Sequence, residues 1–243
     1  MSGHSKWANI KHKKEKTDAQ KAKVFTKIGK EMAVAVKAGG GDPTSNSKLR
    51  DLIQKAKANN VPNDNIERII KKAMGSTGED YEEITYEGYG PGGVAVIVET
   101  TTDNRNRTAG NVRSYFNKYH GNMGTSGCVS FLFEDKGVII VNNEDGDIDE
   151  DKLMETALES GAEDFAAGDG VFEIYTTPDD LYAVKETLVG AGYPVLSAEP
   201  DKIPTTSVTL SDADDLKFMG LLVEMLEEDD DVMNVYHNWE NCD

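Results

Sequence analysis

Hydrophobic positions in the first third of the chain recur with the period of α-helices. Residues 18–38 carry one apolar side and end at a glycine run that cannot continue a helix. Similar spacing predicts a helix over 47–58 and a third between Pro62 and Gly75. Together these stretches predict a small N-terminal three-helix bundle.

Short apolar runs and alternating patterns take over further along the chain, and they predict strands separated by helices. The expected strands are 94–101, 129–134, 137–142, 162–167, 171–176, 194–199, 205–210 and 232–239. One expected helix has Ala109, Val112, Phe116 and Tyr119 at its inward positions, and the others lie near 150–160, 179–191 and 212–228. The polar, acidic stretch 76–83 is interpreted as a linker.

The middle of this series has the order βαββαβ, which is typical of the ferredoxin-like fold. The pieces before residue 135 and after residue 204 supply a second set of the same elements. We therefore expect an α+β protein in which an N-terminal three-helix bundle is followed by two ferredoxin-like α/β domains, one inserted into the other. The expected domains are 1–77, then 78–135 plus 204–243, with 136–203 as the insertion.

Charge is divided unevenly between the two ends of the chain, whose formal net charge is -18. Residues 1–75 hold 17 Lys and Arg against 7 Asp and Glu, whereas residues 76–243 hold 9 against 37. A segregated basic segment indicates contact with a polyanion, because the acidic remainder repels the same partner. The simpler alternative is a lysine-rich surface that only meets water.

Composition excludes several other classes of protein. No apolar run is long enough to span a membrane, and no secretory signal is visible, so we expect a cytoplasmic protein. Cys128 and Cys242 are far apart, which gives no support to a disulfide framework or a zinc site. We expect no cofactor, no metal and no small-molecule substrate, and we expect a monomer.

Enzyme motifs fail when their context is considered. Gly88, Gly90 and Gly93 match GxGxxG, but they precede a strand instead of opening a helix, so a glycine-rich turn is favoured. The acidic stretch from Asp145 lacks the glycine and glutamate that a calcium loop needs. We therefore expect a non-enzymatic protein, with an enzyme acting on RNA as a remote alternative.

Nucleic-acid contact is the chemistry that the basic segment favours. Lysines can neutralise phosphates and an indole can stack on an unpaired base, although Trp7 could equally pack on the bundle. The lysine side of the first helix, opposite its apolar side, would extend this surface. The candidate residues here are Lys6, Trp7, Lys11, His12, Lys13, Lys14, Lys16, Lys23, Lys27 and Lys30.

A second basic island lies in residues 102–118. Arg105 and Arg107 are expected in a loop before a helix that starts near Thr108, where backbone N–H groups also attract phosphate, and Arg113 follows on that helix. The alternative is that these arginines pair with neighbouring acids.

Six ordered blocks carry a family resemblance: GHSKWANIKHKK, FTKIGKEM, GGGDP, NVPNDNIERIIKKAMG, YEGYGPGGVA and TDNRNRT. The chain resembles the YebC/PmpR family and the mitochondrial translational activators similar to it. The resemblance implies three domains, one helical and two α/β, in a non-enzymatic protein. It also implies two functions, DNA-binding transcriptional regulation and ribosome-associated help with difficult sequences such as proline runs. The absence of a presequence favours a bacterial cytoplasmic member.

Physical chemistry favours one of these functions. Reading duplex DNA calls for Arg, Asn or Gln on a recognition helix, whereas the helices of the predicted bundle present mainly lysine, which binds phosphate. Folded RNA suits a cationic arm with a distant arginine island. We therefore expect a ribosome-associated translation factor that contacts rRNA, with a DNA-binding transcriptional regulator as the alternative.

Overall fold

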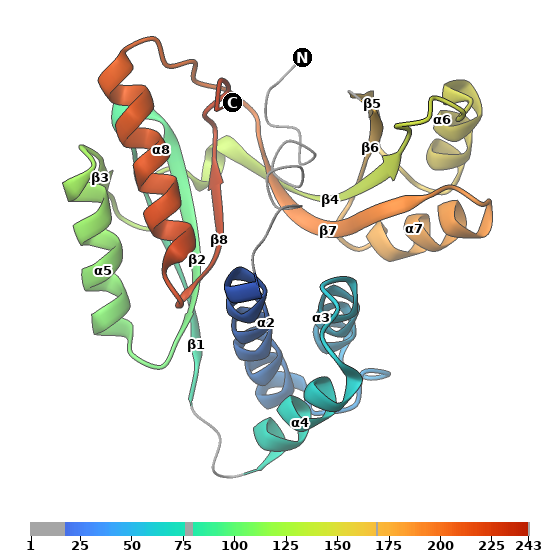
Figure 1. Cartoon of the computed structure of the whole chain (residues 1–243), viewed down its shortest axis with the longest axis horizontal. Helices are drawn as coiled ribbons and strands as arrows, with labels where there is room; N and C mark the ends of the chain where they lie inside the picture. Colours follow the sequence, from blue (N-terminus) through green and yellow to red (C-terminus); the bar gives the residue numbers. More distant parts are fainter. Residues whose placement is uncertain (1–17, 76–79, 169, 243) are drawn as a thin grey trace. The chain divides into compact units, whose positions relative to one another are not determined.

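The structure of the protein is a computed structural model, and it describes residues 18–75, 80–168 and 170–242. These residues form two compact units, one of residues 132–207 and one of the remaining described chain (Figure 1). The second unit contains both a helical part and an α/β part. Because the two parts lie in one unit, the expectation that residues 1–77 form a separate domain stays a prediction. The expected fold class is confirmed: helices come first, followed by two α/β parts with four-stranded antiparallel sheets.

Three helices make up the helical part: α2 (Asp18–Gly39), α3 (Ser47–Ala58) and α4 (Asn63–Met74). Their core lies where the periodicity predicts it, with the side chains of Ile28, Met32 and Leu49 fully or almost fully buried. Asn46 fixes the start of α3, because its side chain accepts a hydrogen bond from the Leu49 N–H and donates to the Ala35 carbonyl. The three-helix arrangement follows from these inward stripes.

The α/β part of the same unit has one sheet covered by two helices. Its elements are β1 (Glu82–Tyr89), β2 (Ala95–Thr102), α5 (Arg105–Lys118), β3 (Asn122–Met123), α8 (Ala213–Glu228) and β8 (Val232–His237). The strand order is β3-β1-β2-β8, so β2, α5 and β3 form a split βαβ unit around β1. Val96, Val98 and Phe116 are buried between the sheet and the helices.

Three expectations for this part, one linker and two strands, were wrong in detail. The linker expected over 76–83 overlaps β1, which begins at Glu82 and which the sequence analysis missed. In the stretch 129–134, Ser130–Leu132 form a 3-10 turn and the last two residues begin the strand Phe133–Asn142. The stretch 205–210 contributes only an isolated bridge from Val208 to Trp239. The chain order is therefore ββαβ followed by αβ.

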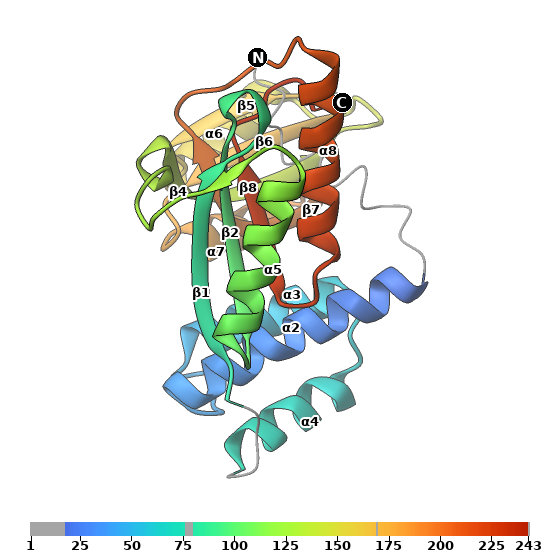
Figure 2. The same cartoon turned by 90° about the vertical axis from the view of Figure 1, so that its left-hand side faces the viewer.

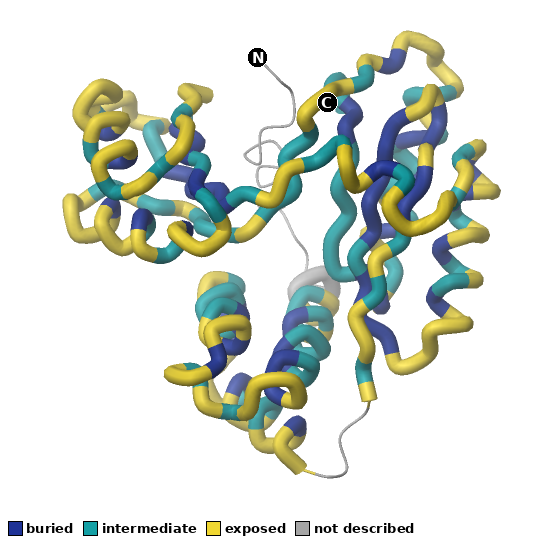
Figure 3. Tube along the Cα trace, turned by 180° about the vertical axis from the view of Figure 1, so that it is seen from behind, coloured by how far each residue is buried: buried dark blue, intermediate teal, exposed yellow. Residues whose placement is uncertain are grey.

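The inserted unit has the predicted βαββαβ order. Its elements are β4 (Phe133–Asn142), α6 (Glu150–Glu159), β5 (Asp164–Ala167), β6 (Val171–Thr176), α7 (Leu181–Gly190) and β7 (Val195–Pro204). The strands pair in the order β5-β6-β4-β7, all antiparallel, which is the ferredoxin-like arrangement. Ile139, Ile174 and Leu181 belong to its core. Buried positions concentrate in the two sheets and on the inner sides of the helices (Figure 3).

The GYGPGG sequence covers the end of β1 and the turn that leads to β2, and it does not open a helix of the kind that a dinucleotide site needs. Gly92 and Gly93 have φ values of 64° and 82°, in the left-handed region that favours glycine. Gly88 lies within β1, where an added Cβ would meet the Asn122 carbonyl oxygen at 2.5 Å. The glycines therefore shape a turn and admit β3 to the sheet, and their arrangement differs from that of a dinucleotide site.

Candidate nucleic-acid interface

The predicted N-terminal arm falls outside the described residues. This applies to Lys6, Trp7, Lys11, His12, Lys13, Lys14 and Lys16. Their roles in binding stay predictions. The structure does describe the side chains of the other candidates, which lie on α2 and α5.

Three lysines of α2 contact the carboxyl end of α8 or the turn that follows it. The ammonium groups of Lys23 and Lys27 donate to the carbonyl oxygens of Glu228 and Glu227, at 3.1 Å and 2.8 Å. The last carbonyl groups of a helix have no partner within the helix and carry partial negative charge. The lysine side of α2 therefore binds the carboxyl end of α8 and is not simply a free cationic face.

Lys30 extends this contact to a buried carboxylate. Its ammonium group donates to the Asp230 carbonyl oxygen and to Oδ1 of Asp231, both at 2.8 Å. Oδ2 of Asp231 accepts hydrogen bonds from Arg107 at 2.7 Å and Thr108 at 2.8 Å. One carboxylate thus joins α2, α5 and the turn between α8 and β8.

The pKa values of Asp231 and Lys27 are both lowered at this contact, but for different physical reasons. Burial alone would raise the pKa of Asp231, but the hydrogen bonds from Lys30, Arg107 and Thr108 outweigh burial and lower that pKa to about 2. Burial lowers the pKa of Lys27 to about 8, because the nearby carboxylates only partly offset the loss of water. The Asp231 pairing stabilises the folded state, whereas burying the Lys27 charge costs stability.

The arginine island adopts a different geometry from the expected one. Helix α5 begins at Arg105 and is capped by the Asn104 side chain, so Arg105 and Arg107 lie in its first turn and not in a loop before Thr108. Arg107 pairs with Asp103 and Asp231, which is the alternative that the sequence left open. Arg105 is exposed, with Glu82 at 4.0 Å, and Arg113 is exposed further along α5.

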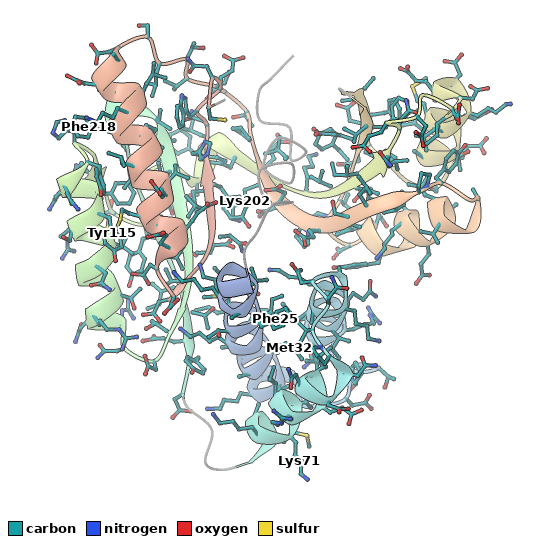
Figure 4. All side chains as sticks on the ribbon, viewed as in Figure 1. Phe25, Met32, Lys71, Tyr115, Lys202 and Phe218 are labelled. Atoms are coloured by element: carbon teal, nitrogen blue, oxygen red, sulfur yellow. The ribbon has the colours of Figure 1, made fainter. Side chains whose placement is uncertain are left out.

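Helix α4 carries a cationic face whose residues were not among those predicted from the sequence. Arg68, Lys71 and Lys72 are exposed and follow the spacing that places side chains on neighbouring positions of a helix. Their side chains make no hydrogen bond or ion pair with the described residues. In Figure 4, Lys71 points outward from α4, away from the core that holds Met32. The sequence IERIIKKAM contains these three basic residues, but the larger number of lysines in α2 directed the prediction to that helix.

A pocket between α2 and α4 lies beside this face. Lys30, Lys37 and Lys72 line it together with Tyr81 and small side chains. Lys30 already pairs with Asp231, and Lys37 pairs with Asp80. Lys72 is therefore the lysine of this pocket whose ammonium group has no acidic partner among the described residues.

The described ranges contain neither a metal-binding cluster nor a helix that could span a membrane. No group of three or more His, Cys, Asp or Glu side chains there could hold a metal ion. None of the helices in the described chain has both the length and the apolar character needed to cross a bilayer.

Comparison with known proteins identifies close relatives over the whole chain. A curated protein from Acetivibrio thermocellus is 60% identical over 240 residues, covering 98% of this chain and 99% of the relative. One from Lachnoclostridium phytofermentans is 57% identical, covering 99% and 100%. Both are named probable transcriptional regulatory proteins.

A solved structure and two family models also match nearly the whole chain. The crystal structure of a conserved hypothetical protein from Aquifex aeolicus is 48% identical, covers 97% of each chain and superposes with a TM-score of 0.85. The sequence model of the TACO1/YebC protein N-terminal domain matches residues 5–76, and that of the TACO1/YebC second and third domain matches residues 81–239. The chain therefore belongs to the TACO1/YebC family.

Proposed function

We propose that this protein is a non-enzymatic, nucleic-acid-binding regulator of gene expression that works in the cytoplasm. The names of its relatives support the regulatory part of this proposal. The observation that carries the nucleic-acid part is the charge division, with 17 basic against 7 acidic residues in 1–75 and 9 against 37 in the remainder. Such a chain presents its basic segments to a polyanion, while its acidic segments are repelled by the same partner.

More specifically, the protein acts as a ribosome-associated translation factor that contacts rRNA. The open cations of α4 support this role, because lysines bind phosphates with little preference for base sequence. Folded RNA offers many phosphates on an irregular surface that separate basic segments can contact together. Assistance with proline-rich sequences rests on the family resemblance.

The second candidate is a DNA-binding transcriptional regulator, which the names of the relatives favour. A regulator that reads sequence in duplex DNA presents side chains to base edges in the major groove. Lys71 and Lys72 of α4 suit phosphates better than base edges, so this function has less physical support.

Co-sedimentation with ribosomes at physiological salt tests the first proposal. The full chain should sediment with ribosomes, and the variant Lys11→Glu/Lys13→Glu/Lys14→Glu should be released while its circular dichroism and thermal midpoint stay unchanged. Charge reversal at Lys152, an exposed residue of α6 in the acidic inserted unit, serves as a control for a reversal outside the arm. If the triple variant stays on ribosomes, the prediction that the N-terminal arm binds the ribosome is wrong.

A salt titration with competing duplex DNA separates the two candidates. With roughly 5 to 8 phosphates engaged, the affinity for ribosomes should fall with salt at a log-log slope of about -4 to -7. A ribosome-associated factor stays on ribosomes when random-sequence DNA is added in excess. Transfer to DNA at the same salt concentration would favour the transcriptional function.

A further inference from the structure

The outer face of α5 has an unusual composition for this acidic protein. The 14-residue helix contains three Arg and no acidic residue, although the chain as a whole has 44. Four of its exposed residues, Asn106, Gly110, Arg113 and Asn117, recur at intervals of four, three and four positions, which places them along one strip of the helix. We call these four residues the α5 strip. Figure 2 shows α5 in front of the sheet, with its outer face toward the viewer.

The polar side chains of the α5 strip are available to a partner. Asn106, Arg113 and Asn117 make no hydrogen bond or ion pair with any described residue. The opposite side of the helix is occupied by the core, since Thr108, Val112 and Phe116 are fully buried. The packing of α5 on its sheet therefore uses the inner side of the helix, and the α5 strip takes no part in it.

Nothing in the fold requires the strip to have this composition. Asn and Gly are poor helix formers, and a solvent-exposed helix face gains stability from Ala, Glu, Lys or Arg. A Cβ added at Gly110 would find no atom within 4 Å, and the glycine has no positive φ, so neither space nor backbone conformation calls for glycine. An exposed glycine in mid-helix does permit the close approach of another molecule.

We propose that the α5 strip is a docking surface for the minor groove of an A-form RNA duplex, an inference that rests on the proposed function. The minor groove of A-form RNA is wide and shallow, and it displays 2′-hydroxyl groups and base edges. Asn106 and Asn117 can donate to and accept from these groups, and Arg113 between them can pair with a phosphate. Gly110 lets the ribose approach the helix backbone.

The decisive variant is Gly110→Ala in the full chain, because its effects on stability and binding should have opposite signs. Alanine is the better helix former, so the thermal midpoint should rise. The added methyl group should weaken binding to an RNA duplex of about 20 base pairs by roughly tenfold. A purely structural residue could not give both results. The same duplex made of DNA, which lacks the 2′-hydroxyl groups, should bind equally well to both proteins.

Gly220→Ala is the matched control. Gly220 lies in the interior of α8, and a Cβ there would also find no atom within 4 Å, but Lys217 and Glu224 flank it one turn away on either side. This variant should gain stability and keep its affinity for RNA. Asn106→Ala/Asn117→Ala should lose affinity as Gly110→Ala does.

The outcomes distinguish this inference from the function on which it rests. If the wild type binds ribosomes and RNA and Gly110→Ala binds both equally well, the inference is overturned and the proposed function stands. Equal losses in Gly110→Ala and Gly220→Ala, or a loss confined to DNA, also overturn the inference. Loss of ribosome binding with RNA duplex binding intact would assign the strip to a protein partner. A wild type that binds neither ribosomes nor RNA overturns both proposals.

Discussion

Lys30 and Asp231 lie 201 residues apart in the chain, and their side chains form an ion pair of 2.8 Å. Both side chains are largely shielded from water, with exposed fractions of 13% and 7%. A shielded pair of this kind stabilises a structure only where other hydrogen bonds satisfy the remaining lone pairs. Thr108 and Arg107 supply those hydrogen bonds, so Asp231 anchors the helical part on the α/β part of the same unit.

Replacement of Asp231 by asparagine should lower the free energy of unfolding. The native pairing moves the pKa of Asp231 from an ordinary value of 3.8 to about 2. A shift of this size corresponds to about 2 to 3 kcal/mol, which chemical denaturation can measure. Asp230→Asn is the control, because Asp230 is exposed and contacts Lys30 through its backbone carbonyl. Equal losses in the two variants would mean that bulk charge, and not the pairing, stabilises this region.

The contribution of Asp231 should also depend on pH in a defined window. Its folded pKa is depressed, so the stabilisation is complete above the unfolded value near 4 and is lost as pH falls toward 2. The difference in unfolding free energy between wild type and Asp231→Asn should therefore be constant from pH 7 to about pH 4 and then shrink. Denaturation curves of both proteins at several pH values measure this difference. A difference that stays constant below pH 4 would contradict the assignment.

Local sequence patterns predicted the elements whose burial is one-sided and regular. The α2 stripe of Ile28 and Met32 and the whole βαββαβ order of the insertion could be predicted because each pattern repeats within its own element. Strand β1 was missed because it opens with two acidic residues, and its burial develops only toward Glu87 and Gly88. Its partner β2 provides the pairing that identifies it as a strand.

The candidate site was harder to predict, because charge alone does not say which partner a lysine meets. Lys23 and Lys27 had the expected helical spacing, but their contact with the end of α8 depends on residues about 200 positions away. Arg107 meets Asp231 across 124 positions in sequence. Long-range pairing of this kind leaves no periodic trace in a single sequence.

Glu87 should hold the loop after β3 in place. This buried carboxylate accepts hydrogen bonds from the backbone N–H groups of Gly127, Val129 and Ser130, at 2.7, 2.8 and 2.9 Å. Burial raises the pKa of Glu87, but the backbone donors outweigh it and leave that pKa below its ordinary value. Glu87→Gln replaces an acceptor oxygen with a donor and should cost about 1 to 3 kcal/mol.

Amide hydrogen exchange can localise that effect. The N–H groups of Gly127, Val129 and Ser130 should exchange faster in Glu87→Gln, by roughly tenfold for each 1.4 kcal/mol lost. Glu82→Gln on the same strand is the control, because the Glu82 side chain is half-exposed. Unchanged exchange at these three amides would show that the loop is held by other contacts.

Replacement of Lys27 by methionine should raise stability at neutral pH. Burial lowers the pKa of Lys27 to about 8, so below pH 8 the folded state bears the cost of a charge removed from water. Methionine keeps the apolar stem and removes the charge, and we expect a gain of about 1 to 2 kcal/mol after loss of the hydrogen bond to Glu227.

The advantage of Lys27→Met should shrink as pH rises. The wild type gains stability between its folded pKa near 8 and the unfolded value of 10.5, because the folded lysine loses its proton first. Thermal denaturation at pH 7 and pH 10 tests both parts of the prediction. A variant that is less stable than the wild type at pH 7 would show that the Lys27 ammonium group contributes more by its contact with α8 than its burial costs.

Charge reversal on α4 should weaken ribosome binding without affecting the fold. Lys71 is exposed, has no acidic partner among the described residues and lies beside Arg68 and Lys72. Lys71→Glu should therefore lower affinity and reduce the log-log salt slope by about one, because one fewer phosphate is neutralised. Lys152→Glu makes the same change in net charge on α6 of the inserted unit, where acidic residues surround it. If the cationic face of α4 touches RNA, only Lys71→Glu changes the slope in ribosome co-sedimentation. If both variants weaken binding equally, the effect comes from net charge, and α4 is not part of the interface.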